Sequence, residues 1–364
     1  MSTIKVNSIK NTATNDGGIA IDNSGHVQID GQQLPSAGPL SNRNLVINGA
    51  MQVAQRGTSK TGLTNGDGGY HTVDRFRFGE HGAPTYQFTM TQSTDAPEGF
   101  RYSMRFDTTT AQATLVTDDS AYMETKLEGR DLGRTKYGTS NAEDITLSFY
   151  VKGSVPGTYV IWFYNPSGAD SACTQTYTIN SADTWEYKQI TVAGDTALAI
   201  SDTVNAGMHI RWILAAGPDY TSGTTSTTWT NNSVTNANRY GGQTVNLAAS
   251  TNNDWQITGV QLEVGSVATP FEHRSYGDEL ARCQRYYTKA YFRTRLALSN
   301  TTLAEFPIYF KQSMRANPDL SATADLGTVS AISESGFGTE GCYLDFSNHQ
   351  SSNYAAYWEA SAEI

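Results

Sequence analysis

Two neighbouring stretches, DITLSFYVKG (144–153) and GTYVIWFYNP (157–166), decide the fold class of this chain. The apolar side chains of the first stretch recur at every second position, namely at Ile145, Leu147, Phe149 and Val151. This period is that of a β-strand with one buried face. The second stretch is apolar on both faces, as expected for a central strand of a β-sandwich. Both stretches end in residues that favour turns.

The same alternation recurs between residues 41 and 275. It is found in TYQFTMTQ (85–92), RYSMRFD (101–107), WEYKQITV (185–192), MHIRWILAAG (208–217) and WQITGVQLEV (255–264). Many short strands joined by turn residues, with little helical period between them, are typical of an antiparallel sandwich or jelly roll. We therefore expect a mainly β chain with a jelly-roll-like sandwich over 41–275. The Thr- and Asn-rich stretches around 219–237 and 241–254 are predicted to be long surface loops.

One short helix is predicted at the end of the stretch ITGVQLEVGSVATPFEHRSYGDELARCQRYY (257–287). Ser275 can cap it, with Asp278 three residues on. Four residues recur at helical spacing and are predicted to share one face: Tyr276, Leu280, Cys283 and Tyr287. That face is a candidate packing surface between the copies of an oligomer, or against the chain's own sandwich.

Strand patterns return after the helix, so residues 276–364 are predicted to hold the helix and a small β-module. These patterns lie in RTRLALSN (293–300), EFPIYFKQ (305–312), CYLDFSN (342–348) and YAAYWEASAEI (354–364).

Residues 1–40 differ from the rest of the chain. The stretch IKVNSI (4–9) is a possible short strand, and GIAIDNSGHVQIDG (18–31) is predicted to be a hairpin that sets Ile19 and Ile21 opposite Val27 and Ile29. A lone hairpin is marginal in water, so we expect it to pack on identical chains or on a docking surface. The stretch LPSAGPL (34–40) is predicted to be a linker.

Composition excludes several classes of protein. The formal net charge is −10, without a basic cluster to offset it, so neither nucleic acid nor an anionic membrane is an expected partner. No run of about 18 apolar residues predicts a membrane-spanning helix. The start of the chain lacks the apolar stretch of a secretory signal. The three cysteines lie far apart, which argues against a disulfide framework or a zinc site.

The sequence does not predict a catalytic residue, a bound metal or a cofactor. It contains no GxSxG elbow, no phosphate loop and no HExxH, and its six histidines never fall two or four residues apart. The stretch TNGDGGYHTVD (64–74) offers Asn65, Asp67 and Asp74 as calcium ligands, but its composition is also that of any tight turn. The acidic pairs at 118–119 and 143–144 resemble charges at strand edges.

Aromatic residues give the candidate binding site. Tyr220, Trp229 and Tyr240 lie in the Thr- and Asn-rich loops, where an exposed ring can stack on a sugar while neighbouring polar groups bind its hydroxyls. These three residues are the candidate glycan contacts. The alternative is that their rings pin the loops to the sandwich. The tryptophans within strand patterns, at 162, 185, 212 and 255, are predicted to be mostly core residues.

Several blocks resemble bacteriophage tail fibre proteins: NLVINGAMQVAQRG (44–57), DRFRF (74–78), the 257–287 stretch and FPIYFKQSMRANPDL (306–320). The opening residues 1–31 are similar to the N-terminal segments of tail fibres from marine and cyanobacterial phages. Blocks around 110–140 and 219–254 match nothing in the family and are expected to be variable tips. The chain lacks the HxH motif of metal-threaded fibre tips and any coiled-coil heptads, so a short fibre is expected.

The resemblance implies a homotrimeric virion protein that is made in the host cytoplasm. Residues 1–40 would attach it to other tail proteins such as a nozzle or adaptor. The distal β-modules would bind a host polysaccharide or outer-membrane receptor. The family's recognisable blocks are structural, so no enzymatic activity is expected. Two alternatives stay open: a depolymerase tailspike that cleaves host polysaccharide, and a purely structural tail adaptor or decoration protein.

Overall fold

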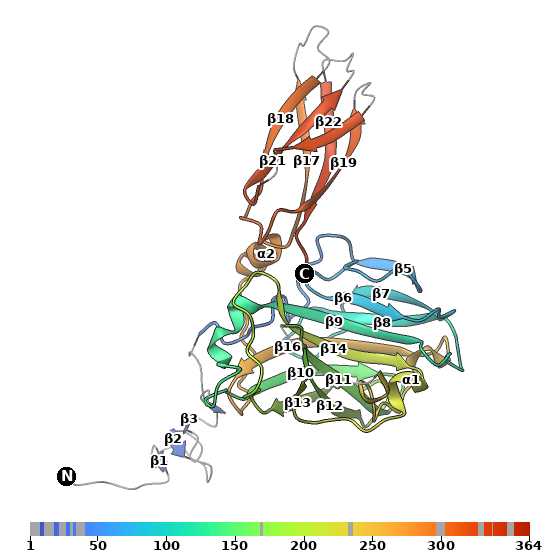
Figure 1. Cartoon of the computed structure of the whole chain (residues 1–364), viewed down its shortest axis with the longest axis vertical. Helices are drawn as coiled ribbons and strands as arrows, with labels where there is room; N and C mark the ends of the chain where they lie inside the picture. Colours follow the sequence, from blue (N-terminus) through green and yellow to red (C-terminus); the bar gives the residue numbers. More distant parts are fainter. Residues whose placement is uncertain are drawn as a thin grey trace, which may run out of the picture.

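The chain forms a large β-sandwich that bears an elongated β end module, as the computed structural model in Figure 1 shows. The structure describes residues 8–10, 18–21, 27–29, 32–33, 41–167, 170–231, 236–295, 303–326, 331–336, 338–347 and 353–364. Within these residues the sheets are antiparallel and helices are few. The prediction of a mainly β, sandwich-forming chain is confirmed.

Two six-stranded sheets form the sandwich. The first has the order β13-β10-β16-β8-β7-β5 and the second the order β15-β12-β11-β14-β9-β6. The strands of the first sheet are β5 (Ser59–Leu63), β7 (Gln87–Ser93), β8 (Ser103–Thr110), β10 (Ile145–Gly153), β13 (Glu186–Val192) and β16 (Asp254–Val264). Those of the second are β6 (Arg77–His81), β9 (Ser120–Glu128), β11 (Gly157–Asn165), β12 (Ser171–Ile179), β14 (Ala206–Ala216) and β15 (Thr230–Asn231).

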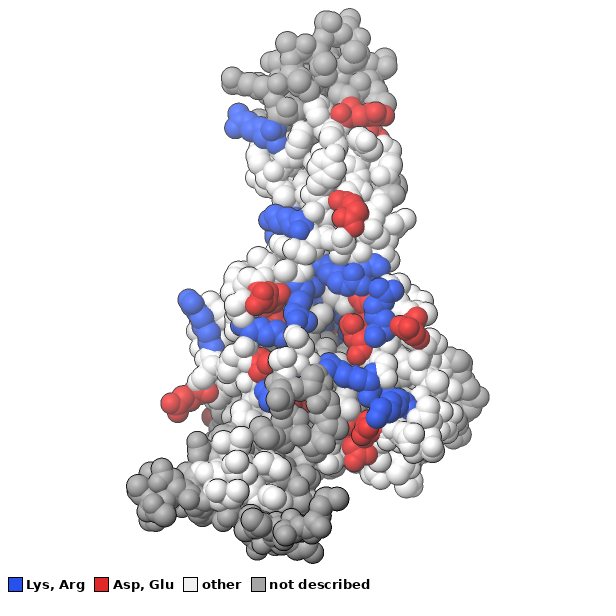
Figure 2. All heavy atoms as spheres, turned by 90° about the vertical axis from the view of Figure 1, so that its left-hand side faces the viewer, with Lys and Arg blue, Asp and Glu red and all other residues white. Residues whose placement is uncertain are grey.

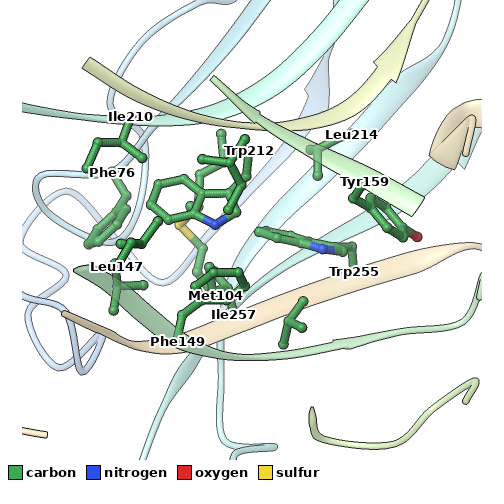
Figure 3. Packing of buried hydrophobic residues seen from close by; sticks show 14 of the residues in the cluster. Phe76, Met104, Leu147, Phe149, Tyr159, Ile210, Trp212, Leu214, Trp255 and Ile257 are labelled. Carbon is green, nitrogen blue, oxygen red and sulfur yellow. The ribbon is translucent and has the colours of Figure 1, made fainter. Parts of the chain in front are cut away.

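The core of the sandwich lies between the two sheets and is rich in aromatic rings (Figure 3). Phe149 of β10 meets Trp212 of β14 edge-on, with ring centroids 5.9 Å apart. Trp255 of β16 is fully buried, and its indole nitrogen donates to the Tyr177 hydroxyl at 3.0 Å. All four residues that define the period of β10 are fully buried, so this sequence prediction is confirmed.

Strand β11 is apolar on both sides because both of its faces are covered. Ile161 and Phe163 point into the core between the sheets. Val160 and Trp162 point to the outer face of the second sheet and are also buried, in a separate apolar cluster. The short helix α1 (Pro218–Thr221) and the segment that contains Tyr240 contribute rings to this cluster. This is the central strand that the sequence predicts.

The segment 110–140 is a correction to the sequence prediction. We expected a variable loop, but this segment contains β9, which pairs with both β14 and β6. A 3₁₀ helix, η1 (Gly129–Thr135), follows it directly. Strand β9 was hard to recognise because its outward face bears Glu124 and Lys126. Glu124 pairs with Arg77 of β6 and Arg211 of β14, and Lys126 lies near Glu124 on the same strand. The 219–254 region is largely irregular and adds the 3₁₀ turns η2 (Asn236–Asn238) and η3 (Leu247–Ala249).

A bulge in the first sheet requires a glycine. The pairing of β10 with β16 shifts register between Ser148 and Tyr150. Gly259 lies opposite this shift with a φ of +63°, a region that residues with a Cβ rarely adopt. A Cβ at Gly259 would also lie 2.8 Å from the ring of Phe100. The bulge therefore lets aromatic rings approach the outer face of this sheet closely.

The predicted helix is present as α2 (Tyr276–Gln284), and the Ser275 hydroxyl caps it by accepting a hydrogen bond from the Asp278 amide at 3.2 Å. The predicted helix face is wrong, however. The chain leaves the helix after Gln284, and Tyr287 begins β17, where it pairs with β22. Strand pairing therefore takes Tyr287 out of the helical register.

The buried side of α2 also differs from the predicted face. Tyr276 is 56 % exposed and Leu280 is half-buried, whereas Cys283 is fully buried. The buried side also includes Glu279, which is polar. Its carboxylate accepts a hydrogen bond from the backbone of Asn48 at 2.6 Å, which explains why an acidic residue is buried there.

The end module packs two three-stranded sheets, β17-β22-β19 and β18-β21-β20, around an apolar core that includes Phe306, Leu344 and Trp358. Its strands are β17 (Tyr287–Arg295), β18 (Leu303–Tyr309), β19 (Asp319–Leu326), β20 (Ala331–Ser335), β21 (Gly341–Ser347) and β22 (Asn353–Ser361). The small β-module expected after the helix is thus itself a sandwich.

Ion pairs join the end module to the large sandwich. Arg75, which is 2 % exposed, pairs with Glu363, and its guanidinium lies 3.5 Å from the Tyr286 ring. Glu128 at the end of β9 is buried and accepts hydrogen bonds from Arg285 at 3.0 Å and from the Tyr286 hydroxyl at 2.6 Å. The 257–287 stretch runs from β16, the last strand of the sandwich, through α2 to the start of β17 in the end module.

The blocks that resemble tail fibres meet near this junction. The Asn44 side chain accepts a hydrogen bond from the Leu262 amide at 3.1 Å. The Gln55 side chain donates to Asp74 at 2.6 Å and to the backbone of Tyr287 at 2.8 Å. These blocks thus have a structural role in holding the two modules together.

The described part of the N-terminal segment contains β1 (Ser8–Lys10), β2 (Gly18–Ile21), β3 (Val27–Ile29) and β4 (Gln32–Gln33). The register sets Ile19 opposite Ile29 and Ile21 opposite Val27, so the predicted hairpin pairing is confirmed. These apolar side chains are 36–45 % exposed. Residues 4–7 of the predicted first strand and the linker 34–40 lie outside the described residues.

Candidate functional site

A row of side chains crosses the outer face of the second sheet. The register aligns one residue from each of five neighbouring strands, in the order Thr174, Trp162, Arg211, Glu124 and Arg77. Residues directly opposite each other on one sheet face are close enough to interact. The row therefore joins an aromatic ring at one side to a charged cluster at the other.

Glu124 is the centre of the charged cluster. It is fully buried and accepts hydrogen bonds from Arg77 at 2.9 Å, from His209 at 2.9 Å and from Arg211. Burial alone would raise the pKa of Glu124, but the hydrogen bond from His209 and the charge of Arg211 hold it well below its usual value. Burial in turn lowers the pKa of His209. Glu124 is therefore a fixed negative charge that is already fully engaged by the protein.

A cavity of about 270 Å³ lies beside this row. Its lining residues are Trp162, Tyr164, Asp170, Ser171, Ala172, Arg211 and Arg239, and we call it the Trp162 pocket. The rings of Trp162 and Tyr164, two residues apart on β11, stack with centroids 4.8 Å apart and planes 9° from parallel. Trp162 is buried, whereas Tyr164 is half-buried.

Two arginines flank the Trp162 ring. Their guanidinium carbons lie 4.9 Å (Arg211) and 5.7 Å (Arg239) from its centroid, within the range of a cation–π contact. Two residues that line the pocket carry a buried donor without a hydrogen-bond partner among the described residues, namely the indole nitrogen of Trp162 and Nε of Arg239. Buried polar groups in native proteins usually have partners, so these two N–H groups are candidates to donate to a ligand.

The structure overturns the expectation that Tyr220 and Tyr240 are exposed. They are 2 % and 1 % exposed, and their ring centroids lie 5.3 Å apart. Tyr240 meets Trp162 edge-on at 6.2 Å, and its hydroxyl lies 3.5 Å from Arg211. These rings pin their segments onto the outer face of β11, because that face offers apolar surface, and they form the buried support behind the Trp162 pocket.

Trp229 is also held by the protein. It is half-buried, its indole nitrogen donates to the backbone of Ala193 at 2.8 Å, and its ring meets Tyr137 edge-on at 5.5 Å. It does not line the Trp162 pocket. The contacts of all three loop aromatics agree with the alternative prediction, in which their rings anchor their own loops.

Sequence reasoning placed Trp162 in the core and did not single out Tyr164, Arg211 or Arg239. A partial signal was present, since β14 alternates His209 and Arg211 with apolar residues, which predicts a polar outer face. Arg239 could not be found this way, because it lies in an irregular segment between α1 and β16.

A second hollow, of about 520 Å³, lies on the outer face of the first sheet. It is lined mainly by aromatic and small polar side chains, among them Phe100, Tyr150, Tyr187, Phe271 and His273. Tyr187 is 46 % exposed, and its ring centroid lies 5.0 Å from that of Tyr150. We call this hollow the Tyr187 groove. Its lining contains no Lys or Arg among the described residues, unlike that of the Trp162 pocket.

A third hollow, of about 690 Å³, lies beside α2 and is lined by Arg274, Arg282 and Arg285 together with Asp278. Figure 2 views the molecule from this side and shows Lys and Arg side chains gathered at the neck below the end module. Asn42 also lines this hollow and binds Arg282 through its side chain at 3.0 Å. The arginines here therefore partly serve to hold the start of the sandwich against α2.

The candidate calcium loop is a turn. The Asp67 carboxylate accepts a hydrogen bond from the Thr64 amide at 3.0 Å, and Asp74 is buried against Gln55. In the described residues, no three His, Cys, Asp or Glu side chains are grouped so that they could hold a metal ion. Within the same residues, no helix has the length and apolar character needed to cross a membrane.

No family model matches the chain, and no curated protein matches it. Several solved structures do. The enzymatically active domain of bacteriophage CBA120 tailspike protein 4 is 12 % identical, with a TM-score of 0.32, over 61 % of this chain and 21 % of that one. This chain thus spans about a fifth of the tailspike structure that it matches.

Two carbohydrate-binding modules match in a similar way. A family 11 module of a Clostridium thermocellum cellulase is 12 % identical, with a TM-score of 0.27, over 60 % of this chain and 98 % of that one. A module described as TmCBM61, in complex with β-1,4-galactotriose, is 9 % identical, with a TM-score of 0.27, over 61 % and 99 %. At these values we draw no functional conclusion from the matches.

Proposed function

We propose that this chain is a bacteriophage tail fibre protein whose large sandwich binds a host-surface glycan in the Trp162 pocket. The observation that supports it best is the stacked pair of Trp162 and Tyr164 beside buried N–H donors that lack partners. A sugar ring can place its apolar face against Tyr164, while its oxygens accept from the Trp162 indole and from Arg239. Such acceptors would relieve a desolvation penalty of about 1–3 kcal/mol for each unpaired donor.

The virion role is supported by the sequence blocks that resemble tail fibres and by the exposed apolar hairpin of the N-terminal segment. Ile19, Ile21 and Ile29 present apolar side chains to solvent, as a segment that docks on another protein would. The proposed partners of residues 1–40 are other phage tail proteins, such as a nozzle or adaptor. The proposed assembly is a homotrimer, in which the exposed Tyr276 and half-buried Leu280 would contact neighbouring copies near α2.

Deletion of residues 1–40 tests the attachment. The truncated protein should still fold and keep the solution mass of a trimer by light scattering, but it should no longer join tails. Incorporation at the normal level would place the attachment elsewhere in the chain. A monomeric full-length protein that is fully folded would contradict trimer formation before assembly.

We propose a binding role without catalysis. Glu124 is a buried carboxylate bonded to Arg211 of the pocket lining, and its hydrogen bonds to two arginines and a histidine leave it unsuited to act as a general acid. The alternative of a depolymerase predicts new reducing ends when the protein is incubated with host polysaccharide. The alternative of a structural adaptor predicts that pocket substitutions leave host adsorption unchanged.

The direct test of glycan binding uses two matched variants. Tyr164→Ala removes the ring that faces the pocket, and Tyr187→Ala removes an exposed ring from the opposite sheet. We expect Tyr164→Ala to weaken binding to purified host surface polysaccharide about tenfold, because a stacked ring contributes on the order of 1 kcal/mol. Tyr187→Ala should leave it unchanged. Loss of binding in Tyr187→Ala alone would move the site to the Tyr187 groove.

A further inference from the structure

The charge of the Trp162 pocket is opposite to that of the chain. The chain has a formal charge of −10, yet two arginines line the pocket, and Arg77 and Lys126 lie on the same sheet face. The carboxylates in this region are Glu124, Asp170 and the buried Asp195, which accepts a hydrogen bond from Ser171 of the pocket lining at 2.8 Å. Four cations therefore face three carboxylates, at a site where the protein as a whole would repel an anion.

One carboxylate is shared by three of these cations. Glu124 lies within 4 Å of Arg77, Lys126 and Arg211. It is buried and cannot rotate toward the pocket without leaving these partners. Positive charge thus remains on this face after Glu124 is counted.

Arg239 is the least compensated of the cations. No carboxylate of a described residue lies within 4 Å of its guanidinium, and its Nε lacks a hydrogen-bond partner in the same part of the chain. Its guanidinium carbon lies 5.7 Å from the centroid of the Trp162 ring. A guanidinium presents its donors as a planar fork that matches two oxygens of a carboxylate or sulfate.

Asp170, the second carboxylate, is engaged by a neighbour. Burial of the Tyr164 hydroxyl and its hydrogen bond to Asp170 raise the pKa of Tyr164. Asp170 is exposed at the rim, where water screens its charge. Asp170 therefore binds the Tyr164 hydroxyl and forms no ion pair with Arg239, whose guanidinium stays available to a ligand.

We infer that the Trp162 pocket selects an acidic sugar, one that carries a carboxylate or a sulfate group, over a neutral sugar. This inference rests on the proposed glycan-binding function. The sugar ring packs on Tyr164, and its anionic group accepts from the Arg239 fork and from the Trp162 indole. A neutral sugar would leave the charge of Arg239 without a counter-charge, so it would bind less well.

The test measures binding of the full-length protein to an array of defined oligosaccharides in three classes: uronic-acid-containing, sulfated and neutral. The array is repeated with Arg239→Gln, which keeps a polar side chain without the charge, and with Arg239→Lys, which keeps the charge without the fork. Tyr187→Ala is the matched control. Thermal unfolding of each variant reports whether the fold is intact.

We expect the intact protein to bind acidic oligosaccharides at least tenfold more tightly than neutral ones. Arg239→Gln should lose this preference, Arg239→Lys should keep part of it, and Tyr187→Ala should keep all of it. Raising the salt concentration should weaken the acidic complexes and leave neutral ones unchanged. Binding of the uronic-acid class alone, or of the sulfated class alone, identifies which anionic group the pocket accepts.

Two other outcomes would contradict the inference and differ from each other. If neutral glycans bind as tightly as acidic ones, and Tyr164→Ala abolishes that binding while Arg239→Gln does not, the pocket binds glycans but does not select anions. If no glycan of any class binds, the proposed function itself is wrong, and the inference falls with it.

Discussion

Arg211 lies directly opposite Trp162 in the pairing of β14 with β11, and its guanidinium carbon is 4.9 Å from the centroid of the indole ring. The same side chain donates to Glu124, its neighbour on β9. Arg211 therefore joins the buried carboxylate to the aromatic pocket. Arg239, by contrast, reaches the same ring from an irregular segment and has no carboxylate partner among the described residues.

This difference predicts that two substitutions in one pocket lower stability by different amounts. Arg211→Met should lower the free energy of unfolding by about 3 kcal/mol, because it leaves the buried Glu124 with fewer partners. Arg239→Gln should lower it by less than about 1 kcal/mol. Urea denaturation of both variants measures these changes in the free energy of unfolding. Equal effects would show that Arg239 is also a structural residue and would weaken its assignment to a ligand.

Trp229 gives a second prediction. Trp229→Ala should cost about 2 kcal/mol of stability, because it removes both the hydrogen bond to Ala193 and the edge contact with Tyr137. Trp229→Phe should cost about half as much, since it keeps a ring but loses the donor. Chemical denaturation gives the stabilities, and adsorption to host cells should be unchanged in both. A drop in adsorption without a loss of stability would restore Trp229 as a glycan contact.

The junction between the modules gives a third prediction. Glu363→Gln removes the counter-charge of Arg75, which is 2 % exposed, and should destabilise the protein by about 3 kcal/mol. The matched control is Glu143→Gln, which breaks an ion pair with the largely exposed Lys136 and should cost less than about 1 kcal/mol. Denaturant unfolding compares the two. Similar values for both variants would mean that the buried pair does not hold the junction.

Asp74 predicts a dependence of stability on pH. Burial raises the pKa of Asp74 to about 6, against the hydrogen bonds from Gln55 and the charge of Arg56, which lower it. A carboxyl group whose pKa is higher in the folded state stabilises the fold below its ordinary pKa, and this contribution is lost as the pH rises through 6. Between pH 5 and pH 8 the wild type should therefore lose about 1 kcal/mol of stability through this group.

Asp74→Asn isolates that contribution, because the amide does not titrate. The difference in unfolding free energy between variant and wild type should shift by about 1 kcal/mol in favour of the variant from pH 5 to pH 8. Glu124 does not interfere, since its lowered pKa confines its titration to more acidic solutions. A difference that stays constant over this range would show that Asp74 is ionised throughout.

Local pattern alone predicted much of the fold. The period of two around Phe149 predicted a strand with one buried face, and the apolar run around Trp162 predicted a strand covered on both sides. Ser275 predicted the start of α2, because a cap requires only residues within one turn. The hairpin pairing of Ile19 with Ile29 is equally local.

Contacts between residues distant in the sequence decided the rest. Glu124 made β9 look like a loop, because the arginines that neutralise it come from β6 and β14. Tyr287 does not lie on the predicted helix face, because it is the first residue of β17 and pairs with β22. Tyr240 is buried because the outer face of β11 offered it apolar surface.

In the Trp162 pocket too, some features follow from local sequence pattern and others from contacts between distant residues. The sequence by itself determined that β11 and β14 are strands and that Trp162 and Arg211 point to one side of them, since alternation is a property of the extended backbone. Only the tertiary structure decided that these two residues face each other and that Arg239 joins them. The physical reason is that register and loop packing depend on long-range burial and charge pairing, which no short stretch of sequence encodes.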